Sequence, residues 1–452
     1  MKRVPQGMGK VPLLASWCGG ASLTSGPFSC SPQYFQDRLI VGNCSANGKD
    51  GNWTSQDPGP AAPCRDDFNF GNWLALLSQL PLLLFTLLNS LLYPCIPDKV
   101  RILGSLAGIL VLFVLTATLV RVEMPPARFF SITMASVWFI NSFCAILQGS
   151  LFGQLGSFPQ SYSTVFLSGQ GMAGTFATTA MLLSLASGLD AQTSALSYFV
   201  TPCVGTLISI VCYLVLPYKV RRGSFVRPRG HGKARDGPLR VRSGDANQLL
   251  FSPQDFARHH LDKSREEEPV CELEMKTGLL SPGQWIWQLA LSIILVFSIT
   301  LSVFPAITAS VSTVSENKTW QKFFTPVCCF LLFNIMDWLG RSATSYFSWP
   351  EKHLRLLPGV VGLRLFLVPL FLFCNVSPRA SLPLLFRQDA WFVLFMLVFS
   401  LSNGYFVSLS MCLAPKQVQP HESELAGAIM TFFLALGLSC GAGLSFALKA
   451  LL

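Results

Sequence analysis

The stretch TPVCCFLLFNIMDWLGRSATSYFSW (Thr325–Trp349) decides the fold class of this chain. It is apolar and long enough to cross a bilayer as a helix, yet it contains Asp337 and Arg341. A charge at the bilayer centre costs about 2.5–3.5 kcal/mol. Because side chains four residues apart share a helix face, we expect the two charges to neutralise each other. Such a pair either holds a polar solute or is a structural ion pair between helices, and the rarity of intramembrane charges favours the first interpretation.

The composition extends this interpretation to the whole chain. Hydrophobic residues make up 51% of the 452 residues and charged residues only 12%, against about 25% in soluble domains. None of the apolar runs alternates as a barrel strand does, so the spans are predicted to be helical. We therefore expect an all-α polytopic membrane protein with spans at Asn72–Tyr93, Ile102–Val120, Phe129–Gly153, Thr164–Ser187, Ser194–Pro217, Gln284–Ala309, Thr325–Trp349, Leu357–Cys374, Gln388–Met411 and Leu425–Leu448.

The orientation of the spans follows from charge and glycosylation signals. A basic excess marks a cytosolic segment, and one follows the fifth span: Lys219, Arg221, Arg222, Arg227, Arg229, Lys233, Arg235, Arg240 and Arg242. Counting spans from there places three N-x-Ser/Thr sequons outside, at Asn43, Asn52 and Asn317. We expect Asn43 and Asn52 to be glycosylated. A fourth sequon, at Asn375, lies at a helix end, too close to the membrane to be modified.

Four regions result. Residues 1–71 form an extracellular segment, 72–217 a bundle of five spans, 218–283 a disordered cytosolic loop, and 284–452 a second bundle of five spans. The net charge of +10 is concentrated in the loop, so it indicates orientation and lipid-headgroup contact and excludes nucleic acid as a partner. The first segment contains four cysteines, for which three pairings or free thiols are all open: Cys18, Cys30, Cys44 and Cys64.

Polar side chains inside the spans mark a candidate pathway. Gln79 lies in the first span, Gln148 and Ser150 lie in the third, and Asn334 shares one stripe of the seventh span with the Asp337–Arg341 pair. Amide, hydroxyl, carboxylate and guanidinium groups suit a solute with several hydroxyls and a heteroaromatic ring. A single Gln or Asn in a span often makes only an interhelical hydrogen bond, but this set on three helices favours a polar cavity.

The motifs that the sequence lacks narrow the function further. We find no nucleophile–base pair, no H-E-x-x-H and no Walker A motif, so we expect no enzyme, no cofactor and no metal. Without an ATPase unit, transport is passive or ion-coupled. Ion coupling usually needs additional intramembrane carboxylates, so passive uniport is the simpler hypothesis. A receptor is disfavoured because ten spans do not match a seven-helix pattern.

Several motifs resemble the equilibrative nucleoside transporters. They are FNIMDWLGRS (333–342), ILQGSLF (146–152), SGQGMAG (168–174) and SNGY (402–405). Two further runs most resemble type 2 members of that family: VFPAIT (303–308) and MTFFLALGLSCG (430–441). The resemblance implies an eleven-span fold of two pseudo-symmetric bundles of the major-facilitator type. It also implies facilitative, energy-independent uniport of nucleosides, and for type 2 of nucleobases, by alternating access across the plasma membrane.

The resemblance also implies roles for individual residues. Arg341 and Asp337, with Asn334, belong to a ribose-recognising network, and Gln148 addresses the base with Ser150 beside it. The cavity is expected to be lined or shaped by Gln79, Leu82, Leu438, Phe304 and Pro305. Cys144 replaces a glycine found in some members, which predicts weak sensitivity to nucleoside-analogue inhibitors.

The N-terminus departs from the family pattern. Met1–Ser31 is polar and Gly/Ser-rich where the family has its first span, so we count ten spans in place of eleven. A second hypothesis follows, in which the chain is a truncated, non-transporting isoform that is degraded or associates with a full-length copy. The expected partners are otherwise nucleosides, nucleobases and the lipid bilayer, and no feature of the sequence indicates an oligomeric state.

Overall fold

The computed structural model describes residues 70–93, 95–122, 125–187, 200, 202–215, 286–349, 354–377, 383–420 and 422–450. The predictions for residues 1–69 and 218–283 lie outside the described residues. These include the sequons Asn43 and Asn52, the four N-terminal cysteines and the basic loop.

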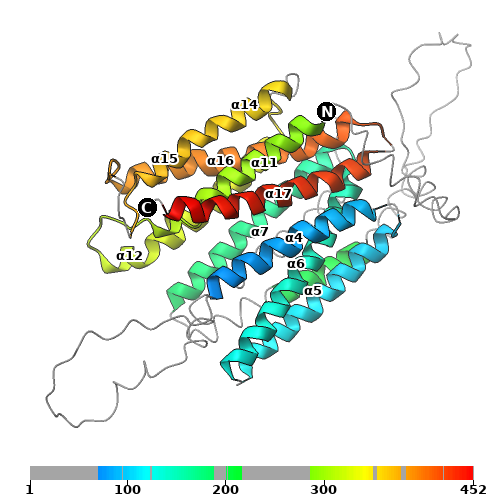
Figure 1. Cartoon of the computed structure of the whole chain (residues 1–452), viewed down its shortest axis with the longest axis horizontal. Coiled ribbons are helices and arrows are strands. Elements are labelled where there is room, and N and C mark those ends of the chain that lie inside the picture. Colours follow the sequence, from blue (N-terminus) through cyan, green and yellow to red (C-terminus); the bar gives the residue numbers. More distant parts are fainter. Residues whose placement is uncertain are drawn as a thin grey trace, which may run out of the picture.

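Five helices make up the described part of the first half (Figure 1). They are α4 (Phe70–Leu91), α5 (Asp98–Arg121), α6 (Pro126–Gly156), α7 (Gln160–Ser187) and a helix at Pro202–Val215. Proline starts α6 because its fixed φ suits the first helical turn, where no backbone N–H is needed. Pro81 lies inside α4.

Two spans of the second half are interrupted. The span that contains Asp337 consists of α12 (Lys318–Phe324), the π-helical η3 (Thr325–Leu331) and α13 (Leu332–Ala343). The next consists of α14 (Leu357–Gly362), the 3-10 turn η5 (Leu363–Phe366) and α15 (Leu367–Leu372). The remaining spans are continuous: α11 (Ile286–Val303), α16 (Asp389–Leu413) and α17 (Ser423–Ala450). Segments of π or 3-10 helix within a longer helix often mark functional positions.

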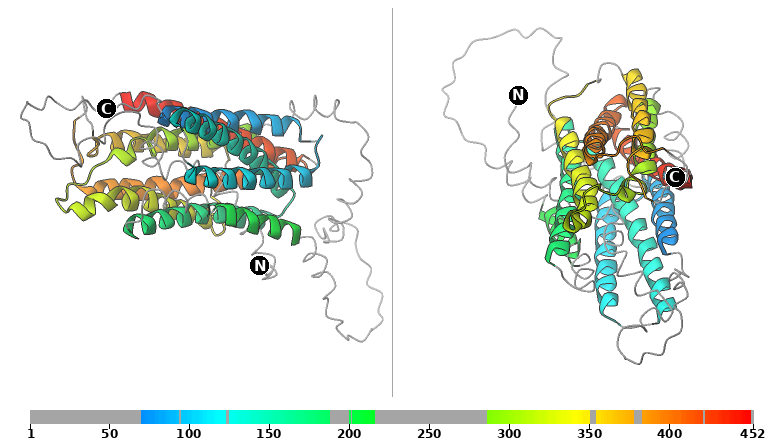
Figure 2. Two further views of the ribbon diagram at one scale, coloured as in Figure 1. Left: turned by 90° about the horizontal axis from the view of Figure 1, so that it is seen from below. Right: turned by 90° about the vertical axis from the view of Figure 1, so that its left-hand side faces the viewer.

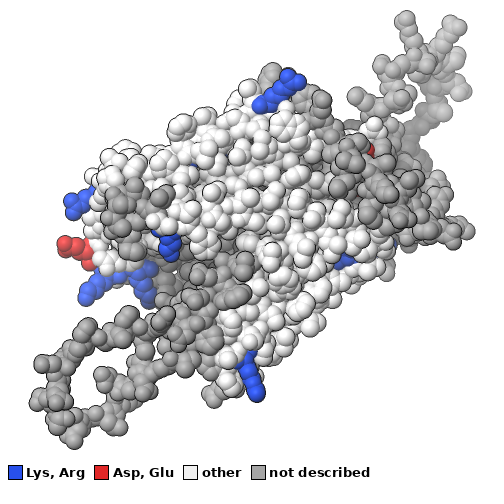
Figure 3. Space-filling view, in the orientation of Figure 1, with Lys and Arg blue, Asp and Glu red and all other residues white. Residues whose placement is uncertain are grey.

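Each of the ten predicted spans overlaps a helical segment of the described residues. By length and composition, seven helices of the described chain can cross a membrane, and Leu77–Leu91 and Pro202–Val215 are shorter apolar helices. Helix α7, the fourth predicted span, is in neither group. It is 28 residues long but rich in Ser, Thr, Gly and Gln, and it packs against α13. In Figure 3 a band without Lys, Arg, Asp or Glu crosses the middle of the visible face, and the charged side chains gather toward its ends.

The helices lie side by side along the long axis of the molecule, and their packing joins the two halves in two places (Figures 1 and 2). Helix α17 packs on α4, α6 and α11, and α7 packs on α13. Glycines permit the close approach: a Cβ at Gly427 of α17 would lie 2.2 Å from the Phe152 carbonyl oxygen of α6. Within the described residues, extended pairing is limited to two isolated bridges, Val311–Val376 and Cys374–Phe386.

Candidate functional site

The site is built around the charge pair of α13. Nε of Arg341 donates to Oδ2 of Asp337 at 2.7 Å, so the ion pair predicted from the four-residue spacing is present. The side chains are largely buried, with 13% of Arg341 and 8% of Asp337 exposed. A buried carboxylate needs its remaining lone pairs satisfied, so the neighbours of this pair decide what it can do.

The second carboxylate oxygen of Asp337 accepts a hydrogen bond from a side chain of α16. Nδ2 of Asn403 donates to Oδ1 of Asp337 at 2.7 Å, and both residues are buried. Gly404 brings the two helices together, since a Cβ there would lie 2.0 Å from the Asp337 carbonyl oxygen. Asn403 and Gly404 belong to the SNGY motif, whose role the sequence alone did not reveal. The motif thus supplies both the close approach and the hydrogen bond.

Arg341 also reaches across to the first half. Its Nη1 donates to Oε1 of Gln170 on α7 at 3.4 Å, while Nε2 of Gln170 has no hydrogen-bond partner among the described residues. Gly171 makes room, because a Cβ there would lie 2.8 Å from the Trp338 Cα and 3.1 Å from the Arg341 Cδ. The guanidinium therefore lies between the halves, with its Nη2 not used in any hydrogen bond that we observe among the described residues.

Asn334 lies on the same face of α13, about one turn before Asp337 and about two turns before Arg341. Its Nδ2 donates to the Phe330 carbonyl oxygen at 2.9 Å. Its Oδ1 faces α7, where a Cβ at Gly174 would lie only 2.2 Å away. The SGQGMAG segment thus packs along the stripe of α13 that carries Asn334 and Arg341.

Gln148, predicted to address the base, lies on α6, and Gln79, predicted to line the cavity, lies on α4. Gln148 is 4% exposed, and Oε1 of both Gln148 and Gln79 is buried without a hydrogen-bond partner among the described residues. A buried carbonyl oxygen without a partner costs about 1–3 kcal/mol. Leu82, three residues after Gln79, packs with Ala145, Ala435 and Leu438, and Ala145 lies three residues before Gln148. The structure thus brings Gln79, Leu82, Gln148 and Leu438 into one neighbourhood.

The other predicted residues lie elsewhere. Ser150 is fully buried, and its hydroxyl is directed to the Ile146 carbonyl oxygen (2.7 Å) and to Oδ1 of Asn89 (3.3 Å), toward α4. Cys144 is buried in the main apolar core. Phe304 stacks on Phe333 of α13, with ring centroids 4.0 Å apart. Pro305 follows Phe304 beyond the end of α11, and the peptide bond between them is cis.

Sequence reasoning missed Arg364. This residue lies in η5, is 3% exposed, and forms a buried network with α11 and α16. The sequence does contain a sign of this site, since Arg364 is a charged residue inside an apolar run, as Arg341 is. Its importance depends on neighbours more than 30 residues away, which the sequence does not indicate.

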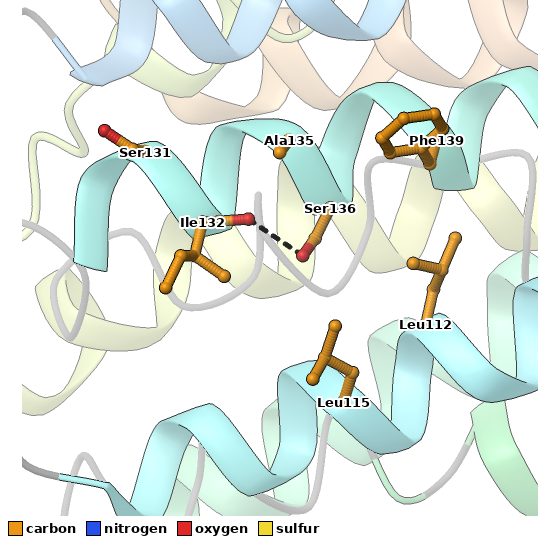
Figure 4. A pocket seen from close by; sticks show the side chains of 7 residues that line it. All are labelled: Leu112, Leu115, Ser131, Ile132, Ala135, Ser136 and Phe139. Atoms are coloured by element: carbon orange, nitrogen blue, oxygen red, sulfur yellow. Dashed lines mark hydrogen bonds between the residues drawn. The ribbon is translucent and has the colours of Figure 1, made fainter. Parts of the chain in front are cut away.

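A groove between α5 and α6 is a separate feature (Figure 4). It has a volume of about 410 Å³ and is lined by Leu112, Leu115, Ser131, Ile132, Ala135, Ser136 and Phe139. The Ser136 hydroxyl is bonded to the Ile132 carbonyl oxygen, so the groove offers little to a polar solute. In the described part of the chain we also find no cluster of three or more His, Cys, Asp or Glu side chains to hold a metal ion.

Comparisons with known proteins identify the family. A family model described as "Nucleoside transporter" matches residues 134–450. The chain is 59% identical over 428 residues to equilibrative nucleoside transporter 2 of Homo sapiens, covering 93% of this chain and 92% of that protein. The chain belongs to the nucleoside transporter family. The resemblance to type 2 members is also confirmed, since identity to the human type 1 protein is 44%, over 94% of this chain and 93% of that protein.

Solved structures confirm the fold class of this family member. The proton:xylose symporter XylE has a TM-score of 0.58 at 11% identity, covering 98% of this chain and 88% of that chain. The fucose:proton symporter FucP of E. coli has a TM-score of 0.52 at 11% identity, covering 98% of this chain and 91% of that chain. The chain is therefore a multi-pass membrane protein, and its described residues have a helical fold like that of these two symporters.

Proposed function

We propose that the chain carries nucleosides, and also nucleobases, by energy-independent uniport across the plasma membrane. The observation that supports uniport is the state of Asp337. It is the one buried carboxylate among the described residues, and Arg341 and Asn403 occupy both of its oxygens. Proton coupling needs an acid that gains and loses a proton during the cycle, whereas both oxygens of this carboxylate already accept hydrogen bonds from protein donors.

In this proposal, the solute bridges the two groups of polar side chains. Arg341 donates to ribose hydroxyls, while Asp337 balances its charge and fixes its direction. The unpaired Oε1 atoms of Gln148 and Gln79 accept hydrogen bonds from the base. A nucleobase lacks the ribose and uses only the glutamines, so its binding is weaker. The binding groups hold the solute without a covalent or proton-transfer step.

The contacts between the halves support alternating access. Ser168 of α7 bonds to the Ser342 hydroxyl at 2.8 Å and accepts from Nε1 of Trp338 at 3.1 Å. The Ser157 hydroxyl donates to Glu424 of α17 at 2.6 Å. All these residues lie toward the predicted cytosolic ends of their helices. A few hydrogen bonds of about 1 kcal/mol each close that side, and an opening of the halves can break them.

Uptake of radiolabelled uridine by the full chain in transport-null cells tests this function. We expect uridine to enter until its internal concentration equals the external one. Cells that express no transporter serve as the control. No uridine uptake by the chain at normal surface expression would overturn the proposed function.

A further inference from the structure

A second arginine is buried in the second half, and no carboxylate of the described residues is in direct contact with it. Four hydrogen bonds hold the Arg364 guanidinium: Nε to the Ser402 hydroxyl (3.1 Å), Nη1 to the Val296 carbonyl oxygen (3.2 Å), and Nη2 to the Phe399 carbonyl oxygen (3.1 Å) and to Oγ1 of Thr300 (3.1 Å). Its carbon also lies 4.8 Å from the centroid of the Phe399 ring. A fork of five N–H donors suits this arrangement, and the ammonium of lysine does not.

The contact with Thr300 connects Arg364 to the solute site. Oγ1 of Thr300 lies 2.7 Å from Oδ1 of Asn403, and Nδ2 of Asn403 lies 2.7 Å from Oδ1 of Asp337. Asp337 in turn accepts from Arg341. One continuous chain of hydrogen bonds therefore runs from Arg364 through Thr300, Asn403 and Asp337 to Arg341, and it joins η5, α11, α16 and α13.

The direction of this chain is set at its Arg364 end. A guanidinium only donates, so Oγ1 of Thr300 accepts from it and shares its own hydrogen between Oδ1 of Asn403 and the Val296 carbonyl oxygen, each 2.7 Å away. The Asn403 amide then presents Oδ1 to Thr300 and Nδ2 to Asp337. With the amide reversed, its oxygen would face the carboxylate. Asp337, which accepts only, and Arg364, which acts through Thr300, therefore favour the same amide orientation, in which Asp337 receives a donor on each oxygen.

We propose that Arg364 is a positioning residue for nucleoside transport, which acts through Thr300 and Asn403 to hold Asp337, and thus Arg341, in the geometry that binds ribose hydroxyls. This inference rests on the proposed function. A positioning role and a packing role predict different results. If Arg364 positions Asp337 and Arg341, its loss should lower the affinity for solutes that have ribose hydroxyls far more than the affinity for solutes that lack them.

The test compares KM and Vmax for uridine and 2′,3′-dideoxyuridine uptake at equal surface expression. For Arg364→Lys we expect the KM of uridine to rise about tenfold, as for loss of a hydrogen bond that involves a charged group, and the KM of dideoxyuridine to change less than about twofold. Thr300→Val breaks the chain but leaves Arg364 in place, so it should show the same selective rise. The matched control is Ser302→Ala on the same helix, because that hydroxyl donates only to the Ile299 carbonyl oxygen.

Each outcome of these uptake measurements either supports or overturns the positioning role of Arg364. If Arg364→Lys does not reach the surface, Thr300→Val gives the answer alone. Equal losses for both solutes, or variants that behave like Ser302→Ala, overturn the positioning role while nucleoside transport stands. Absence of uridine uptake by the unmodified chain is a different failure, because it overturns the proposed function and with it this inference.

Discussion

Nδ2 of Asn403 and Oδ1 of Asp337 lie 2.7 Å apart, between two helices whose backbones nearly touch at Gly404. Asn403 thus donates to the one carboxylate oxygen of Asp337 that Arg341 does not bind. Because the pair is buried, its hydrogen bonds contribute to stability as well as to solute binding. Function and fold are therefore coupled at this point, and variants must be judged on both.

Asn403→Ala should destabilise the protein. It removes the Asn403 partner of Asp337 Oδ1, while the Thr300 hydroxyl keeps the Val296 carbonyl oxygen, and a buried polar atom without its partner costs about 1–3 kcal/mol. Thermal unfolding of the purified protein in detergent measures the loss. Ser400→Ala on the same helix is the control, because this buried hydroxyl bonds only to carbonyl oxygens of its own helix. An equal change in both variants would contradict the special role of Asn403.

Gln148→Leu should separate stability from transport. Replacing a buried amide whose Oε1 has no partner by an apolar side chain of similar size leaves the protein as stable as before, or more stable. The KM for uridine should nevertheless rise about tenfold, as for loss of one solute hydrogen bond. Melting temperature and uptake are measured on the same preparation.

Gln288→Leu is the control for this prediction. Gln288 lies on α11, and its Oε1 is also buried and unpaired among the described residues, but we assign it no solute contact. Transport by this variant should stay normal. A KM that is unchanged in Gln148→Leu, or raised equally in both variants, would refute the assignment of Gln148 to the base.

Gly171→Ala should weaken the contact between the halves. The new Cβ would lie 2.8 Å from the Trp338 Cα, so α7 must move away from α13 and the Ser168–Ser342 bond must lengthen. We expect a lower Vmax for uridine, measured as initial uptake rates. Gly443→Ala is neutral by the same criterion, since nothing lies within 4 Å of its Cβ position. Similar rates in the two variants would show that this contact does not matter.

Uridine uptake should be independent of proton and sodium gradients. Asp337 already has donors on both oxygens, which leaves the described spans without another buried carboxylate to bind a proton. The initial rate into proteoliposomes should therefore be the same with and without an imposed inward gradient of either ion. Accumulation above the external concentration under a gradient would show coupling and exclude uniport.

Sequence reasoning correctly anticipated the features that have a local signature. The length of the apolar runs predicted helical spans, and the four-residue spacing predicted the ion pair between Asp337 and Arg341. Both predictions follow from the rise and the periodicity of a helix. Motif resemblance gave the family before any relative was compared.

What the sequence left hidden depends on long-range contacts. Asn403 and Gln170 stood inside recognised motifs, but their partners lie 66 and 171 residues away. Arg364 passed unnoticed because one arginine does not abolish an apolar span, and its partners are mostly backbone carbonyls and hydroxyls. Such groups carry no distinctive sequence pattern, and only packing shows that they converge.

The central claim is that the Arg341 guanidinium, held by Asp337, binds the solute during transport. Uridine influx through Arg341→Ala, compared with the unmodified chain at equal surface expression in transport-null cells, tests it most directly. The account predicts that influx is abolished while the variant still reaches the surface. Normal uridine influx through Arg341→Ala would contradict it.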